Sequence, residues 1–251
     1  MAQKFNSDGV EIAFIDQGEG LPTLLIHGFA SNKEVNWVST SWTRELRRAG
    51  RRVIALDNRG HGESQKLYDS EAYGTPVMAE DARRLLDHLG ISKADVIGYS
   101  MGARIAAFLA LAHPERVRRA VFSGLGDGMI KGVGAPEPIA EALRAPGHDQ
   151  VRTEQGMVFR RFADQTGADR EALAACIMAS RQTLTPQELA RISVPVLVAV
   201  GTHDEIGGDP VSLARQIPGA RCFAIPGRDH MKAVGDRRHK EAVLRFLAEQ
   251  A

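Results

Sequence analysis

The sequence predicts an α/β fold, a doubly wound and mostly parallel sheet into which a helical cap is inserted. Short apolar runs rich in β-branched residues alternate along the chain with segments of helical period. Repeated strand-helix-strand units of this kind form right-handed crossovers and place helices on both faces of the sheet. One long stretch without a convincing strand interrupts the alternation. The chain has 251 residues, 43% of them hydrophobic, which suits a large domain of this class.

The first strand differs from the later ones. Residues 10–16 alternate apolar and polar side chains after a Ser-Asp-Gly turn, which is typical of a half-exposed antiparallel strand near a sheet edge. The later runs are mostly apolar, as buried parallel strands are; they are residues 23–27, 53–57, 95–99, 120–124, 194–201 and 221–225. Helical period is found at residues 40–49, 76–89, 101–112, 209–217 and 236–250.

The interrupting stretch predicts the cap. Residues 126–192 begin with a segment rich in Gly and Pro and continue into amphipathic stretches at 137–145, 150–165 and 169–181. The core domain then consists of residues 1–125 and 193–251. Apolar cap side chains are candidates for a pocket wall, although helical spacing favours packing inside the cap; they are Met129, Ile130, Met157, Phe159, Phe162, Ile177 and Met178. For Arg160, Arg161 and Arg181, a solvated helix face is favoured over binding of a substrate carboxylate.

Composition excludes several kinds of partner. The 32 Lys and Arg residues nearly balance the 31 Asp and Glu residues, so no overall field attracts nucleic acid or an anionic membrane. No apolar run approaches the roughly 18 residues of a membrane span, and the N-terminus lacks the apolar part of a signal peptide. Cys176 and Cys222 have no metal-site spacing, and each is expected to be a small buried residue. We therefore expect a cytoplasmic protein that binds no metal.

The pattern Gly98-Tyr-Ser100-Met-Gly102 stands where an apolar strand gives way to a helix. A sharp turn in that context exposes the serine hydroxyl at the carboxyl edge of the sheet, beside the unpaired N–H groups of a helix N-terminus. The alternative is a packing serine in a tight turn. A serine hydroxyl is a poor nucleophile at neutral pH, so the catalytic interpretation requires a histidine base and a carboxylate.

The base and the acid are expected downstream. Asp204 and His230 each follow an apolar strand, so both are expected at the same sheet edge as Ser100. Asp127, which follows another strand, is the alternative acid. Asp229 is expected to point elsewhere and to add negative charge beside the site.

The other polar residues are expected to be structural. His88, His113, His148 and His239 are expected to be solvated or to cap helices, and His203 is expected in a loop. The stretch DNRGHGES matches no phosphate-binding spacing, so its side chains Asp57, Arg59 and His61 are expected to connect neighbouring loops.

The segment His27-Gly28-Phe29 follows another buried strand. Gly28 allows the backbone to turn closely, so that the N–H of Phe29 points into the space above Ser100. Together with the N–H of Met101, it would form an oxyanion hole with two donors. His27 is then expected to orient the loop.

GYSMG, the HGF loop, DNRGHGES, the GTHDE loop and the late histidine together resemble the serine-nucleophile branch of the α/β-hydrolase superfamily. The resemblance covers nearly the whole chain, and residues 126–192 fall where that family places its cap. By position it implies Ser100 as nucleophile, Asp204 as acid, His230 as base, and Phe29 and Met101 as oxyanion donors. The chain departs from the family in the charged Arg-Asp pair before the histidine. Serine at the nucleophile position argues against dehalogenase and epoxide hydrolase chemistry, which use aspartate there.

These residues predict a carboxylesterase-type hydrolase that forms an acyl-enzyme with a carboxylic ester or lactone of small to medium apolar character. The reaction needs no metal or organic cofactor, and the small-molecule substrate is the partner expected. Alternatives that use the same three residues are hydrolysis of carbon-carbon bonds or enol-lactones in aromatic degradation, and cofactor-free perhydrolysis. Outside enzymes, the chain would be a ligand-binding module that retains the three residues without turnover.

Overall fold

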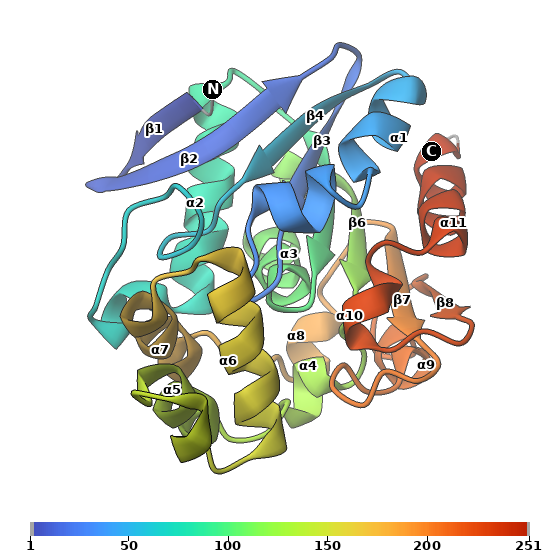
Figure 1. The fold of residues 1–251 in the computed structure, drawn as a ribbon. Helices are drawn as coiled ribbons and strands as arrows, with labels where there is room; N and C mark the ends of the chain where they lie inside the picture. Colours follow the sequence, from blue (N-terminus) through green and yellow to red (C-terminus); the bar gives the residue numbers. More distant parts are fainter. Residues whose placement is uncertain (1–2, 250–251) are drawn as a thin grey trace.

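The computed structural model describes residues 3–249, which form a central sheet with helices on both faces (Figure 1). Within that range, eight strands lie in the order β1-β2-β4-β3-β5-β6-β7-β8. β1 and β2 pair antiparallel, as do β2 and β4, whereas the remaining pairs are parallel. The strands are β1 (Gln3–Ser7), β2 (Val10–Gln17), β3 (Leu21–Ile26), β4 (Arg51–Leu56), β5 (Ala94–Tyr99), β6 (Val117–Ser123), β7 (Val196–Gly201) and β8 (Arg221–Ile225). The predicted fold class is confirmed.

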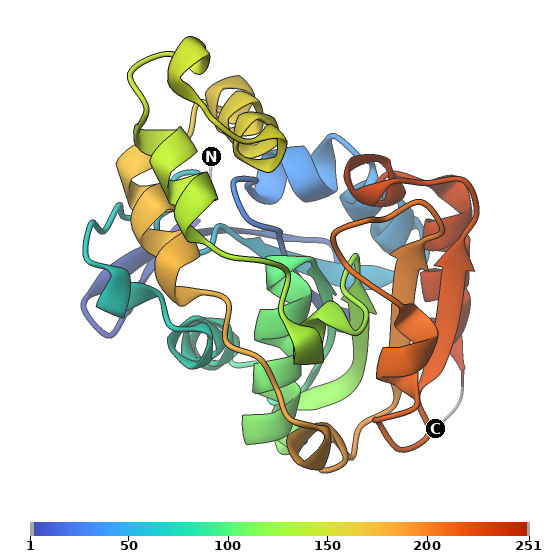
Figure 2. The same cartoon turned by 90° about the horizontal axis from the view of Figure 1, so that it is seen from below.

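Helices cover both faces of the sheet because successive side chains of each strand point to opposite faces. In β3, Leu24 and Ile26 pack into one apolar cluster, whereas Leu25 between them packs into the other. The first cluster includes side chains of α2 (Thr75–His88) and α3 (Met101–Ala112), and the second includes those of α1 (Trp42–Arg48) and α11 (Arg237–Ala248). Figure 2 shows α2 and α3 on the side of the sheet opposite α1.

The helical insertion lies between β6 and β7. Residues 126–192 contain no strand and fall wholly within the described part of the chain. Their helices are α4 (Gly128–Lys131), α5 (Glu137–Arg144), α6 (Glu154–Thr166), α7 (Arg170–Ala179) and α8 (Pro186–Leu189). α5 packs against α6 and α7, and Figure 2 shows α8 apart from these three, at the far end of α3. We retain residues 126–192 as our proposal for the cap.

Two short helices follow β7 and β8. α9 (Pro210–Ala214) is shorter than the helix expected at 209–217, and α10 (His230–Ala233) begins at a candidate catalytic residue. Between residues 3 and 249, none of the helices combines the length and the apolar character that a membrane crossing requires.

Edge strands account for two differences from the sequence-based prediction. β1 was not predicted, because only two of its five residues are buried and its apolar pattern is correspondingly weak. Cys222 is exposed rather than buried, since β8 is the last strand of the sheet and carries few covering side chains. Cys176, in α7, is buried as predicted.

The prediction for His239 was wrong. Its side chain lies on the buried face of α11. Nδ1 donates to the carbonyl oxygen of Ala233 at 3.1 Å, and Nε2 lies 2.8 Å from Ser123 Oγ. The ring also packs edge-on against Trp42. Burial lowers the pKa of His239 to about 4, so the imidazole is neutral at physiological pH.

We expect acid to destabilise the fold below pH 6.5. Burial lowers the pKa of His239 to about 4 and that of His61 to about 3, whereas histidine in an unfolded chain titrates near 6.5. The unfolded chain therefore binds more protons in this pH range, so the free energy of unfolding decreases as pH falls. Each histidine should contribute a loss of about 2 kcal/mol at pH 5 relative to pH 7.

Urea unfolding at pH 7, 6 and 5 measures this decrease. His239→Gln should reduce the pH dependence of the unfolding free energy, whereas His203→Gln, at an exposed loop position, should leave it unchanged. Equal pH dependence in the wild type and the His239 variant would contradict the assignment.

Candidate active site

Ser100 lies at a strained turn between β5 and α3. Its backbone has φ 55° and ψ −113°, a region that residues other than glycine rarely adopt. Two glycines make the turn possible. A Cβ on Gly98 would lie 2.1 Å from the carbonyl oxygen of Gly102, and one on Gly102 would lie 2.0 Å from that of Ile26. The turn therefore requires glycine at both positions, which accounts physically for the Gly-x-Ser-x-Gly pattern.

Ser100, His230 and Asp204 form a hydrogen-bonded chain. Ser100 Oγ lies 3.0 Å from His230 Nε2, and His230 Nδ1 lies 2.8 Å from Asp204 Oδ2. The other carboxylate oxygen of Asp204 accepts the N–H groups of Ile206 and Gly207 at 2.9 and 2.8 Å. This network assigns the proton to Nδ1 of His230, which leaves Nε2 free to accept the serine proton. The arrangement fits general-base activation of Ser100.

The alternative acid is engaged elsewhere. Asp127 accepts the N–H of Asp209 at 2.8 Å and forms an ion pair with Lys131. Partial burial opposes ionisation, but these two partners hold the pKa of Asp127 below its usual value. Asp229 accepts the N–H of Lys232 at 2.8 Å and caps α10. Neither carboxylate forms a hydrogen bond with His230 among the described residues.

His27 fixes the loop above Ser100. Its Nδ1 donates to the carbonyl oxygen of Gly28 at 2.7 Å, and its Nε2 accepts the N–H of Asn58 at 2.9 Å. Burial lowers the pKa of His27, which keeps the neutral form that this pair of contacts requires. The Asn58 side chain also donates to the carbonyl oxygen of His27. The loop is therefore held from two sides.

The two predicted oxyanion donors are unused within residues 3–249. Neither the N–H of Phe29 nor that of Met101 donates to a protein group there. The Phe29 loop lies directly on the serine turn, since a Cβ on Gly28 would lie 3.4 Å from Ser100 Cβ. Both donors are therefore available close to Ser100, and their role in binding an oxyanion stays a prediction.

In the DNRGHGES stretch, Asp57 and Arg59 connect neighbouring segments, as expected. The expectation was wrong for His61, whose Nδ1 bonds, within residues 3–249, only to the carbonyl oxygen of Arg59 in the same loop. Asp57 accepts hydrogen bonds from the backbone N–H and the ammonium group of Lys33, and also from the N–H of Glu63. Arg59 forms a two-point ion pair with Asp81 on α2. In the described part of the chain, none of these contacts reaches the Ser100 hydroxyl. His203 is exposed in a loop, where its N–H donates to the carbonyl oxygen of Arg228.

Sequence reasoning missed the role of Tyr99. Its hydroxyl donates to the backbone carbonyl oxygen of His230, and burial raises the pKa of Tyr99, which keeps the hydroxyl protonated as a donor. Tyr99 and Ser100 are neighbours in the chain, so this contact connects the serine turn to the backbone of His230. We therefore predict that Tyr99 positions His230.

We expect Tyr99→Phe to lower kcat about tenfold while KM changes little, because His230 loses a fixed position but the pocket keeps its shape. Loss of one buried hydrogen bond should also reduce the free energy of unfolding by about 1–3 kcal/mol. Kinetics at several substrate concentrations, together with urea unfolding, separate the two effects. A variant that is destabilised but retains the wild-type kcat would assign Tyr99 a purely structural role.

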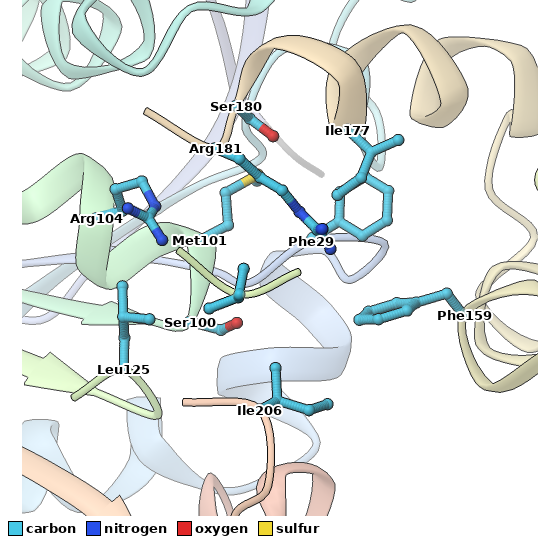
Figure 3. A pocket seen from close by; sticks show the side chains of 11 residues that line it. Phe29, Ser100, Met101, Arg104, Leu125, Phe159, Ile177, Ser180, Arg181 and Ile206 are labelled. Atoms are coloured by element: carbon cyan, nitrogen blue, oxygen red, sulfur yellow. The ribbon is translucent and has the colours of Figure 1, made fainter. Parts of the chain in front are cut away.

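Two pockets meet at Ser100. The first has a volume of about 40 Å³ and includes Met101, Arg104 and Arg181 in its wall (Figure 3). The second has a volume of about 170 Å³ and includes His230 and Met231. Both pockets share Phe29, Ser100 and Phe159. A substrate whose reacting carbon lies at Ser100 can therefore extend in two directions.

The cap side chains divide between the pockets and the core. Phe159 lines both pockets, Ile177 the first and Phe162 the second. Met129 is buried in the apolar core, and Ile130 packs against that core. Met178 lies at a separate cleft beside α5, and Met157 lines neither of the two pockets at Ser100. Packing away from the pockets was therefore correct for Met129 and Ile130, whereas Phe159, Phe162 and Ile177 line a pocket and Met178 is exposed.

The three cap arginines differ from one another. Arg161 is exposed, as expected for a helix face. The expected solvated helix face was wrong for Arg181, which follows the end of α7, is partly buried and lines the first pocket. The prediction of a solvated helix face was also wrong for Arg160, which is buried and donates to the carbonyl oxygens of Ala142 and Ala145. Its guanidinium connects α6 to the end of α5.

Comparisons with known proteins identify the fold family. A family model described as alpha/beta hydrolase fold matches residues 22–177. The 2-hydroxymuconate semialdehyde hydrolase of Pseudomonas putida is 40% identical over 93% of this chain and 89% of that protein. A protein of the same name from Pseudomonas sp. strain CF600 is 32% identical over 87% of this chain, which spans 66% of that relative's length. The crystal structure of the enol-lactonase from Burkholderia xenovorans LB400 superimposes with a TM-score of 0.81 at 25% identity, over 98% of this chain and 100% of that one.

Proposed function

The chain belongs to the α/β-hydrolase fold family, and from this premise we propose that it is a serine hydrolase of carboxylic esters or lactones. Ser100 is the nucleophile, His230 the general base and Asp204 the acid that orients it. The observation that carries the proposal is the chain of contacts of 3.0 and 2.8 Å through His230, which ends on a serine held at a strained turn.

The mechanism follows from these positions. Ser100 Oγ attacks the carbonyl carbon while His230 Nε2 takes its proton, and the N–H groups of Phe29 and Met101 stabilise the developing oxyanion. The imidazolium then gives the proton to the leaving alcohol oxygen, which departs and leaves an acyl-serine. A water molecule, deprotonated by His230, attacks that ester, and the resulting carboxylic acid is released as Oγ regains its proton.

Labelling with a fluorophosphonate tests whether Ser100 is activated. We expect one modified residue, which peptide mass spectrometry should locate at Ser100, together with turnover of p-nitrophenyl acetate and butyrate. A protein that is not labelled and has no turnover would instead be a ligand-binding module. Labelling at a serine other than Ser100 would contradict the assignment of the nucleophile.

The names of two relatives and of one solved structure favour a second candidate. Both proteins named 2-hydroxymuconate semialdehyde hydrolase suggest carbon-carbon bond hydrolysis in aromatic degradation, and the enol-lactonase suggests opening of an enol-lactone. The same three residues serve these reactions. Parallel assays with p-nitrophenyl esters, a vinylogous diketone and an enol-lactone compare kcat/KM directly. A higher kcat/KM for the diketone than for every ester would replace ester hydrolysis by the second candidate.

A further inference from the structure

Two arginines line the first pocket without a carboxylate partner. Arg104 and Arg181 form no ion pair with any acidic group between residues 3 and 249. The negative charge of Glu137 favours the charged form of Arg181, but the Glu137 side chain is exposed to solvent and forms no ion pair with it. Figure 3 shows the Arg181 side chain extending from the chain after α7 into the pocket, with Arg104 at its side and Ser100 below.

Arg104 is held in place by neutral groups. It follows Ser100 by one helical turn on α3, and its side chain is 2% exposed. Its guanidinium donates to the carbonyl oxygens of Gly128 and Gln182 at 3.1 and 2.6 Å, and also to that of Met129. Burial, and secondarily the charge of Arg181, lowers the pKa of Arg104 to about 10. A buried cation with only carbonyl partners is electrostatically uncompensated.

Arg181 is less constrained than Arg104. One nitrogen of its guanidinium donates to the carbonyl oxygen of Gly134 at 2.6 Å. Burial lowers the pKa of Arg181 as well. The pocket thus contains two positive charges a short distance from the nucleophile, and an anionic group bound there would compensate both.

The position of His230 decides which part of a substrate enters which pocket. His230 must give its proton to the leaving alcohol, so the alcohol lies on the side of the second pocket, which His230 lines. That pocket is mainly apolar, with Val35, Phe162 and Val234 in its wall. The acyl part then extends into the first pocket, past Met101 toward the two arginines.

We propose that the substrate carries a carboxylate at the end of its acyl part, bound by Arg181 and Arg104, and an apolar leaving alcohol. The substrate class is the half ester of a dicarboxylic acid. Hydrolysis adds one water across the ester bond and releases a dicarboxylate and the alcohol. This inference rests on the proposed function, whose chemistry at Ser100 it uses unchanged.

Paired substrates test the proposal. The benzyl half esters of succinate, glutarate and adipate are compared with benzyl butanoate, pentanoate and hexanoate, in which a methyl group replaces the carboxylate. Release of benzyl alcohol gives kcat/KM for each. We expect the half ester to be preferred about tenfold or more for at least one chain length, and Arg181→Gln to remove that preference.

Arg161→Gln is the matched control, since it removes the same charge from an exposed cap position. It should retain the wild-type ratio of kcat/KM between the paired substrates. A second measurement uses the wild type alone. Succinate, glutarate or adipate should inhibit hydrolysis of the neutral benzyl esters competitively, and at lower concentration than the matching monocarboxylates.

The outcomes separate this inference from the proposed function. If the ratio of kcat/KM between half ester and neutral ester is near one for every chain length, and the neutral esters are hydrolysed, the carboxylate assignment is overturned. The proposed serine hydrolase function would then be unaffected. A preference that Arg181→Gln and Arg161→Gln reduce equally would also overturn it. If no half ester is hydrolysed, the inference fails, and fluorophosphonate labelling at Ser100 then decides whether the proposed function fails with it.

Discussion

Replacing Ser100 by alanine is expected to lower kcat for ester hydrolysis about 10⁶-fold, as loss of a serine nucleophile does in enzymes with this arrangement. The change removes the hydroxyl that lies 3.0 Å from His230 Nε2 and leaves no group of comparable nucleophilicity on that turn. Affinity for a product carboxylate should persist, because the N–H donors and both pocket walls remain. Calorimetric titration with the product, together with stopped assays at high enzyme concentration, measures both quantities.

Ser92→Ala serves as the control for this prediction, since Ser92 is exposed and lies at the end of the sheet opposite the site. It should retain the wild-type kcat. A Ser100 variant with more than about 1% of the wild-type kcat would contradict the assignment of the nucleophile, since removal of the attacking group costs far more than a hundredfold.

Replacing Asp204 by asparagine is expected to lower kcat about 10⁴-fold. The amide cannot stabilise the imidazolium that forms during the reaction, and it favours the wrong tautomer of His230 by offering an N–H to Nδ1. The N–H groups of Ile206 and Gly207 hold the side chain in position, so the geometry should be nearly preserved. Rates measured from pH 6 to 9 give the effect on kcat and on its pH dependence.

Asp127→Asn provides the matched comparison because Asp127 is the alternative acid and undergoes the same chemical change. Its carboxylate is already engaged by Asp209 and Lys131, so we expect kcat to fall less than about tenfold. The reverse ranking of the two variants would transfer the role to Asp127.

The positions of the candidate catalytic residues could be predicted because each follows a parallel strand. β5, β7 and β8 end at the same edge of the sheet, which brings Ser100, Asp204 and His230 within hydrogen-bond distance although 130 residues separate the first from the last. Apolar strand runs are visible in the sequence, and strand polarity then fixes the edge. Their catalytic roles stay predictions until the variants are measured.

The contacts of Tyr99 and Arg104 could not be predicted in this way. Each side chain binds backbone carbonyl oxygens that are distant in the chain, at His230 for Tyr99 and at Gln182 for Arg104. Every residue has a carbonyl oxygen, so such an acceptor leaves no mark in the sequence. The same reason accounts for Arg160, whose polar type suggested a solvated face although backbone carbonyl oxygens at the end of α5 bind its guanidinium.

The error for His239 has a related origin. A histidine on the last helix of the chain usually faces solvent, but α11 covers the sheet, and a serine at the end of β6 offers a buried partner. Sequence periodicity indicates which face of a helix is apolar, whereas it does not show a polar partner on the element beneath.

The glycines on either side of Ser100 have a consequence for directed evolution. A methyl group on Gly102 would force α3 away from the end of β3, and one on Gly98 would collide with α3 from the strand side. Random mutagenesis at these codons would therefore yield mostly inactive clones, whatever the target substrate. Library diversity is better placed at Leu125, Val133, Ile177 and Ile206, whose side chains line the first pocket. Near Ser100, the two glycine positions therefore tolerate no larger residue, whereas the pocket positions are suitable targets for substitution.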